Sequence, residues 1–233
     1  MLKEALKRII PKEALVLYHR FLAYAASVWY GHPSEKMIVI GVTGTNGKST
    51  VSAMICRVLE EAGYKVGLTT TVLFRIAGKE WLNDTKMTML GRFRLQKLLR
   101  QMVGAGCQYA VIETSSEGIA QSRHAAINYD IVVFTNLTPE HIESHGGFEN
   151  YRAAKGRLFA KLAGEKKKIL AGKIVPKISV VNAADPEANY FLQFWADQKI
   201  GYRLENKKSV LSETASSGTT TVSATNIAMS AQG

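Results

Sequence analysis

Short apolar runs alternate with amphipathic stretches along most of the chain, and this alternation predicts strands that take turns with helices. Contiguous apolar and β-branched residues predict buried strands at 37–40, 66–71, 109–113, 130–136 and 178–182. Apolar residues at helical spacing predict helices at 48–62, 93–103, 149–162 and 186–195. Strands and helices in this order are typical of an α/β fold with a doubly wound, mostly parallel sheet flanked by helices.

Weaker patterns complete the predicted domain. Residues 72–81 alternate around Gly78 and predict a hairpin. Residues 86–90 predict a loop, and 199–203 and 219–225 predict two short strands. We expect these pieces to extend the same sheet.

The first 35 residues form a helical segment set apart from the α/β domain at 36–233. Residues 1–10 have a helical pattern, and Pro11 can begin a second helix, which Gly31-His-Pro-Ser34 ends. The second helix is so rich in apolar residues that it must pack on the domain or on a partner. Association with a membrane surface is a weaker alternative.

The composition is that of a globular protein with excess positive charge. Hydrophobic residues make up 46%, charged residues 21%, and the formal net charge is +11. This charge favours anionic ligands such as nucleotides or phosphorylated substrates. A nucleic acid is not an expected partner, because basic residues are not interleaved with aromatic ones. The basic stretch at 161–177 is interpreted as a solvated insertion.

Cysteine use and the absence of targeting patterns favour the cytoplasm. Cys56 and Cys107 are far apart in sequence and predict reduced, buried thiols rather than a disulfide or a zinc site. No signal peptide is recognisable, and the apolar stretch at 14–30 contains His19 and Arg20 and is short for a transmembrane span.

The stretch Gly41-Val-Thr-Gly-Thr-Asn-Gly-Lys-Ser-Thr50 joins a predicted strand to a predicted helix. Its glycines let backbone N–H groups point inward, and the helix start adds the positive end of a dipole. Lys48 can reach β- and γ-phosphate oxygens, and the Ser49 hydroxyl can bind Mg²⁺. The usual first glycine of a phosphate loop is replaced by Val42, so this loop is a variant.

The carboxyl ends of three predicted strands should converge on this loop, where open parallel sheets bind ligands. Glu113 ends one strand at the place where a phosphate-loop enzyme needs an acidic residue for Mg²⁺. Thr135 and Asn136 end another strand, and His141 follows as a candidate metal ligand. The sequence therefore predicts a nucleotide and magnesium site at this edge.

Four motifs follow one another along the chain: Gly44-Thr-Asn-Gly-Lys-Ser-Thr50, Glu113-Thr-Ser-Ser-Glu-Gly118 with Arg123, Val133-Phe-Thr-Asn-Leu137 with His141, and Tyr151-Arg-Ala-Ala-Lys155. As an ordered set they resemble the Mur ligases over residues 37–185. Their spacing is most similar to the MurE branch, which adds the third residue to UDP-N-acetylmuramoyl-dipeptide.

The resemblance implies an ATP-dependent acid–amino-acid ligase of peptidoglycan precursor synthesis. Its substrates would be a UDP-N-acetylmuramoyl-peptide and an amino acid, and its cofactors ATP and Mg²⁺. A substrate carboxylate attacks the γ-phosphate to give an acyl phosphate, and an amine then displaces phosphate. Such chemistry depends mainly on positioning and charge stabilisation.

The resemblance also implies residue roles. The nucleotide would be bound by Gly44, Thr45, Asn46, Gly47, Lys48, Ser49, Thr50 and Asn136. Magnesium would be bound by Ser49, Glu113 and His141, and the UDP-sugar-peptide by Thr88, Ser115, Gln121 and Arg123. The catalytic residues would be Lys48, His141 and Lys155, the last at the position where Mur ligases carry a carbamylated lysine.

Other interpretations stay open. A folylpolyglutamate-synthase-like enzyme, or another Mur-type ligase acting on a different carboxylate, shares the fold and chemistry, although the former typically has Gly-Lys-Gly-Ser where this chain has Gly-Lys-Ser-Thr. A non-catalytic nucleotide-binding scaffold is suggested by the apolar N-terminal helices. The family's uridine-binding and C-terminal domains are not recognisable, so we expect the chain alone not to complete the ligation.

Overall fold

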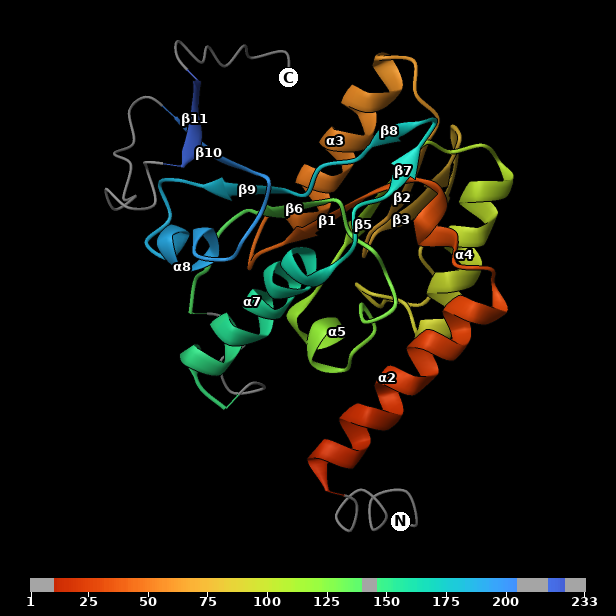
Figure 1. Ribbon diagram of the computed structural model, residues 1–233, viewed down its shortest axis with the longest axis horizontal. Helices are drawn as coiled ribbons and strands as arrows, with labels where there is room; N and C mark the ends of the chain where they lie inside the picture. Colours follow the sequence, from red (N-terminus) through yellow and green to blue (C-terminus); the bar gives the residue numbers. More distant parts are fainter. Residues whose placement is uncertain (1–10, 140–145, 205–217, 225–233) are drawn as a thin grey trace.

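The computed structural model describes residues 11–139, 146–204 and 218–224, and its main sheet has nine strands in this part of the chain (Figure 1). The strands are β1 (Ile38–Thr43), β2 (Val66–Thr69), β3 (Leu73–Ile76), β4 (Lys79–Leu82), β5 (Tyr109–Glu113), β6 (Ile131–Phe134), β9 (Ile178–Asn182), β10 (Gln198–Leu204) and β11 (Thr219–Ala224). A separate antiparallel pair consists of β7 (Ile169–Leu170) and β8 (Lys173–Ile174).

The helices are α2 (Lys12–Trp29), α3 (Lys48–Glu61), α4 (Arg92–Gly104), α5 (Ser116–Ala120), α7 (Phe148–Gly164) and α8 (Ala188–Leu192), with a 3-10 turn, η1 (Pro33–Lys36). Most bounds agree with the sequence prediction within one or two residues. Helix α8 is shorter than the predicted 186–195, and β1 extends beyond the predicted 37–40. The predicted helix at 1–10 lies outside the described residues.

The strand order is β11-β10-β9-β6-β1-β5-β2-β3-β4, and every neighbouring pair is parallel except β2–β3 and β3–β4. The first strand, β1, lies in the middle of the sheet, and the later strands are added outward on both sides. This confirms the predicted doubly wound α/β class, and the antiparallel β3–β4 pair is the hairpin predicted around Gly78.

Each face of the sheet carries its own apolar core (Figure 1). On one face α3 covers the centre, with Cys56 packed against residues of β1, β2, β5 and β6. On the other face α4, α7 and α8 supply the larger cluster, in which Phe134 of β6 stacks on Phe191 with 4.0 Å between ring centroids. Both cysteines are buried and free, as predicted.

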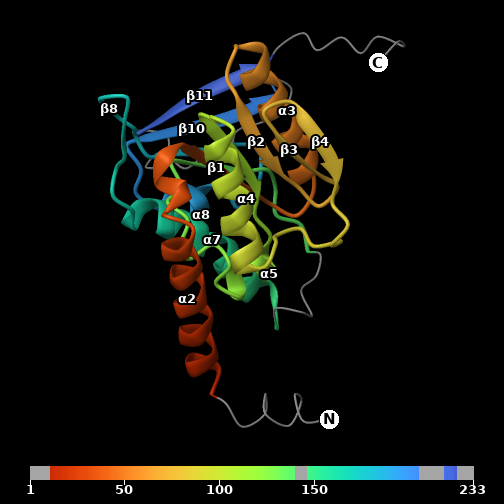
Figure 2. The ribbon, with the colours of Figure 1, turned by 90° about the vertical axis from the view of Figure 1, so that its right-hand side faces the viewer.

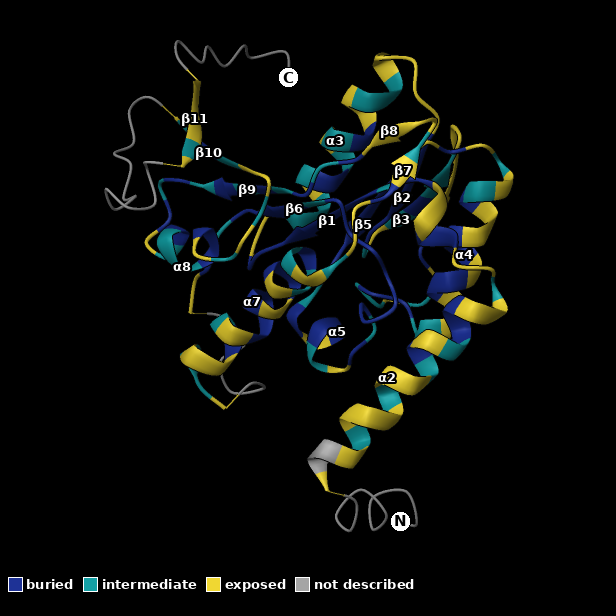
Figure 3. Ribbon diagram, in the orientation of Figure 1, coloured by how far each residue is buried: buried dark blue, intermediate teal, exposed yellow. Residues whose placement is uncertain are grey.

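Helix α2 packs on the domain through its small residues and leaves its large ones in solvent (Figure 3). Ala23 and Ala26 are buried, and Ala23 contacts Ala125 and Ala126. The prediction that the apolar segment packs on the domain therefore holds only for this narrow face. No helix among the described residues is long and apolar enough to cross a membrane.

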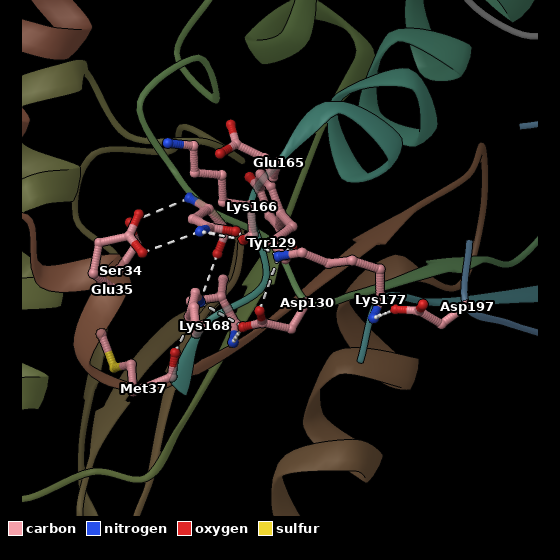
Figure 4. A network of polar contacts seen from close by, with 12 residues as sticks. Ser34, Glu35, Met37, Tyr129, Asp130, Glu165, Lys166, Lys168, Lys177 and Asp197 are labelled. Carbon is pink, nitrogen blue, oxygen red and sulfur yellow. Dashed lines mark hydrogen bonds and ion pairs between the residues drawn. The ribbon is translucent and has the colours of Figure 1, made fainter. Parts of the chain in front are cut away.

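The basic stretch at 161–177 is not the solvated insertion that its composition suggested, because two of its lysines are buried (Figure 4). Asp130 accepts hydrogen bonds from Lys168 Nζ and, at 3.1 Å, from Lys177 Nζ, and also from the backbone N–H of Val39 at 2.8 Å. Burial lowers the pKa of Lys168, and Asp130 opposes that shift. The cations join the stretch to the starts of β1 and β6.

We expect Asp130→Ala to destabilise the fold by about 3–5 kcal/mol, because it leaves two buried ammonium groups without their carboxylate. Glu149→Ala, which removes the exposed partner of Arg152, should cost less than about 1 kcal/mol. Urea unfolding of both variants measures the difference. Equal losses of unfolding free energy would contradict a role for the buried cluster.

Candidate functional site

Three adjacent strands bring their carboxyl ends together beside the loop that follows β1. Strand β1 lies between β5 and β6, with Val42 in register with Glu113 and Thr43 in register with Phe134. The backbone N–H of Thr114 donates to Val42 O at 2.8 Å, and that of Thr135 donates to Thr43 O at 3.0 Å. The predicted convergence of these strand ends is thus what the sheet geometry produces.

The positions of the loop glycines are explained by close contacts. A Cβ at Gly44, where φ is +152°, would lie 1.9 Å from Thr135 Oγ1. Gly47 is the N-cap of α3 and has φ +76°, a backbone conformation that side chains disfavour. Val42, at the usual place of the first glycine, is instead fully buried in the sheet. The loop is therefore shifted along the chain, and its close approach to β6 requires glycine at 44.

The loop is fastened to the end of β6 by a set of hydrogen bonds. The N–H of Thr45 donates to Asn136 O at 2.8 Å, and that of Asn46 donates to Asn136 Oδ1 at 2.9 Å. Thr135 Oγ1 donates to Asn46 O at 2.8 Å. Asn136, expected beside a nucleotide, thus also orders the loop. Thr135 was predicted at this edge of the sheet, but without a role.

The carboxylate of Glu113 is buried and surrounded by hydroxyl groups. Ser49 Oγ donates to Glu113 Oε2 at 2.8 Å, and Thr71 Oγ1 lies 3.1 Å from Glu113 Oε1. The Thr71 N–H also donates to Glu113 Oε2, at 2.8 Å, and Thr71 Oγ1 lies 3.0 Å from Thr88 Oγ1. Thr71 was missed as a site residue, although its place as the last residue of a predicted strand was the available signal.

These oxygen atoms are a donor set that fits Mg²⁺. Magnesium is usually held by one or two carboxylates, with phosphate and water oxygens completing its shell. Ser49 and Glu113 supply a hydroxyl and a carboxylate side by side. No group of three or more His, Cys, Asp or Glu side chains that could hold a metal occurs in the described part of the chain. His141, the third predicted ligand, lies outside the described residues.

Lys155 projects from α7 into the site and is only 1% exposed. Its Nζ donates to Gly44 O at 2.8 Å and lies 4.2 Å from the centroid of the Tyr151 ring. Burial, and secondarily the positive charge of Lys48, lowers the pKa of Lys155 to about 7. Near pH 7 the Lys155 amine is therefore neutral in a substantial share of the molecules. In that form it can act as a nucleophile.

The predicted loop lysine and its neighbours line the same cleft as Lys155. Lys48 Nζ donates to Thr45 O at 2.6 Å, and the hydroxyls of Thr45 and Tyr151 are 3.1 Å apart. The cleft has a volume of about 250 Å³ and is lined by Gly44, Thr45, Lys48, Thr88, Ser115 and Lys155, together with Glu117. It thus unites the loop with two of the four predicted substrate residues.

The other two predicted substrate residues, Gln121 and Arg123, are not among those that line the cleft. Arg123 Nη2 donates to Gln121 Oε1 at 2.7 Å, and its Nη1 donates to Met89 O. They follow α5, whose first turn is capped by Ser115 Oγ, which accepts from the Gly118 N–H at 3.1 Å. Their predicted contact with a substrate stays a prediction.

The family of the chain follows from comparison of its sequence with known proteins. The Mur ligase middle domain model matches residues 42–232. The chain belongs to this family. The predicted resemblance to Mur ligases is thereby confirmed for the middle domain.

Individual Mur ligases support the same conclusion. The chain is 44% identical over 173 residues to the UDP-N-acetylmuramyl-tripeptide synthetase of Roseiflexus sp. (strain RS-1), covering 73% of this chain and 34% of that protein. It is 37% identical over 196 residues to the UDP-N-acetylmuramoyl-L-alanyl-D-glutamate--2,6-diaminopimelate ligase of Geobacillus thermodenitrificans (strain NG80-2), covering 83% and 38%. The Mur-type chain therefore spans little more than a third of these relatives.

Solved structures agree on the fold. A UDP-N-acetylmuramoyl-L-alanyl-D-glutamate--2,6-diaminopimelate ligase superposes with a TM-score of 0.62 at 27% identity, over 75% of this chain and 33% of that chain. A folylpolyglutamate synthase of Mycobacterium tuberculosis, complexed with ADP and AMPPCP, has a TM-score of 0.56 at 14% identity, over 88% and 46%. Because the identity to this synthase is only 14%, the similarity shows a shared fold and nothing about function.

We expect Gly44→Ala to lower the free energy of unfolding by about 1–3 kcal/mol, because the new methyl group collides with Thr135 in a disfavoured backbone conformation. Adding Thr135→Ala should recover part of that loss, which a double-mutant cycle in urea detects as non-additivity. Gly104→Ala, in a helix with open space around it, is the control and should not destabilise. Strict additivity of Gly44→Ala and Thr135→Ala would contradict the contact.

Proposed function

We propose that this chain is the ATP-using part of an amide ligase that extends a UDP-N-acetylmuramoyl-peptide by one amino acid. The observation that carries the proposal is that the phosphate loop and the buried Lys155 line one cleft, while Ser49, next to Lys48 of that cleft, is bonded to Glu113. Membership of the Mur ligase middle-domain family and the names of the relatives support it. A cytoplasmic location, where ATP is available, is part of the proposal.

The loop would bind the phosphates of ATP. The start of α3 directs backbone N–H groups toward the loop, and the helix dipole favours the negative charge of the phosphate chain. Lys48 would exchange its bond to Thr45 O for γ-phosphate oxygens and neutralise charge that develops during transfer. Asn136 and Thr135 hold the loop so that little reorganisation is needed at that moment.

Ser49 and Glu113 would hold Mg²⁺, which when bound neutralises phosphate charge. Thr71 would keep the Glu113 carboxylate oriented, since it donates to it from its N–H at 2.8 Å. Thr88 and Ser115, on the substrate side of the cleft, would position the peptide carboxylate for attack on the γ-phosphate. The carboxylate oxygen bonds to phosphorus as ADP leaves, and the amine later forms the amide bond as phosphate leaves.

Lys155 would serve the site as a carbamate. Its neutral amine can add to carbon dioxide with loss of one proton, which turns the neutral side chain into an anion. The carbamate keeps one N–H, which can still donate to Gly44 O. The change also removes the repulsion between Lys155 and Lys48, which contributes to the lowered pKa of Lys155. An anion at this place would attract the loop lysine and support the metal site.

We expect phosphate release from ATP to be stimulated by UDP-N-acetylmuramoyl-dipeptide and not by a folate substrate, measured on the full product of the reading frame. Lys48→Ala should weaken ATP affinity by roughly ten- to a hundredfold, because it removes a charge-assisted phosphate contact. The control is Lys79→Ala, on the exposed edge strand β4, which should leave ATP affinity unchanged. Unchanged ATP affinity in Lys48→Ala would overturn the loop assignment, and tight ATP binding without stimulation would favour a scaffold.

Carbon NMR with isotopically labelled bicarbonate should show one buried carbamate that is lost in Lys155→Met. Its signal should fall as pH decreases through about 7, because the amine is then protonated, and persist above that pH. Nucleotide affinity measured on the same samples checks that the variant is folded. A carbamate signal that survives in Lys155→Met would show that another amine carries it.

A further inference from the structure

Helix α2 exposes a group of large apolar side chains that is unusual for a helix packed on a domain (Figure 3). Phe21 is 66% exposed and Trp29 78% exposed. The whole group consists of Leu17, Tyr18, Phe21, Tyr24, Val28 and Trp29. Apart from their share in the cleft beside α2, nothing in the described part of the chain covers them.

Most of these side chains form a stripe along α2 that is separate from its buried alanines, and Leu17 and Tyr24 of the stripe border the cleft beside the domain. Leu17, Phe21, Tyr24 and Val28 follow one another at the four- and three-residue steps that align side chains along one helix face. The opposite face carries Ala23 and packs against the region of Ala125. The N-terminal half of α2 projects beyond the rest of the described domain (Figure 2), and the side chains of the stripe are exposed.

Positive charges flank the stripe. An open cleft of about 810 Å³ lies between α2, α5 and α7, and Arg20, Arg157 and Lys161 line it together with Leu17 and Tyr24 of the stripe. Lys161 is also paired with Glu165, at the same cleft. The formal net charge of the whole chain is +11. An apolar stripe thus borders directly on a cationic rim.

We propose that α2 docks this protein on the surface of an anionic lipid bilayer. Leu17, Phe21 and Val28 enter the boundary between headgroups and acyl chains, and Trp29, amphipathic like the tyrosines, sits at headgroup level. The cleft cations Arg20 and Arg157 lie where lipid phosphates approach. This inference rests on α2 and its surroundings and does not depend on the proposed ligase activity.

A second copy of the chain fits the same stripe less well. Two chains of charge +11 repel each other, whereas an anionic bilayer attracts each of them. The stripe is one face of a single helix of 18 residues, which is narrow beside the roughly 1,200 Å² or more that a stable protein interface buries. A bilayer needs no complementary partner surface and can take up side chains of different shapes.

Docking would also orient the catalytic cleft. Helix α5 separates the two clefts: its first turn contributes Ser116 and Glu117 to the one that holds Lys155, while Ile119 lines the one beside α2. The substrate side of the proposed active site therefore lies one short helix away from the lipid-facing cleft. A ligand held at the membrane surface could reach it without crossing the domain.

The test is flotation of the full chain with vesicles of phosphatidylcholine and phosphatidylglycerol in equal amounts, compared with vesicles of phosphatidylcholine alone. We expect binding to the anionic vesicles, weakened by added salt. Phe21→Glu should lower the partition coefficient about tenfold or more, because it replaces the aromatic group that enters the bilayer by a charge. Val58→Glu, equally exposed at 68% but on α3, is the matched control and should bind like the unaltered chain.

Each other outcome overturns the proposal. If the chain floats with neither kind of vesicle, the proposal is wrong. It is also wrong if Phe21→Glu and Val58→Glu lose binding equally. Concentration-dependent dimers that Phe21→Glu abolishes, without vesicle binding, would assign the stripe to a second copy. A large loss of unfolding free energy in Phe21→Glu, again without vesicle binding, would mean that residues 1–10 or another part of this chain cover it. Circular dichroism checks that both variants fold.

Discussion

The contact between the loop after β1 and the end of β6 is the constraint on which the site depends. Gly44 lies so close to Thr135 that no side chain fits, and Asn136 bonds to the loop through both its main chain and its side chain. This contact fixes where α3 begins, and hence where Ser49 meets Glu113. It also sets the carbonyl of Gly44 against Lys155. This one close approach thus orders side chains from strand β5 and from helices α3 and α7.

Buried lysines are used for two different purposes in this fold. Lys168 and Lys177 share the carboxylate of Asp130, so their charge is balanced and they link chain segments. Lys155 instead donates to a carbonyl and lies near an aromatic ring and a second lysine. Burial without a counter-charge lowers an amine's pKa, whereas burial beside a carboxylate opposes that shift. The surroundings, rather than the residue type, separate a structural lysine from a reactive one.

The sequence predicted the order and type of most elements because parallel sheets need long apolar strands and amphipathic helices, and both patterns are local. It also predicted that Glu113 and Asn136 would meet the loop, since strand ends share one edge of the sheet. It failed where the outcome depends on distant partners. Nothing near Lys168 in the sequence reveals that Asp130 will pair with it, and nothing near Phe21 reveals that the buried face of α2 is the one that carries its alanines.

The central claim is that this cleft activates a substrate carboxylate by transferring the γ-phosphate of ATP to it. Positional isotope exchange tests this directly, with ATP that carries heavy oxygen between its β- and γ-phosphorus atoms. If the acyl phosphate forms reversibly, UDP-N-acetylmuramoyl-dipeptide alone, without amino acid, should move the label from the bridge to the outer oxygens of the β-phosphate. ATP that binds with the dipeptide present and keeps its label in the bridge would contradict the account.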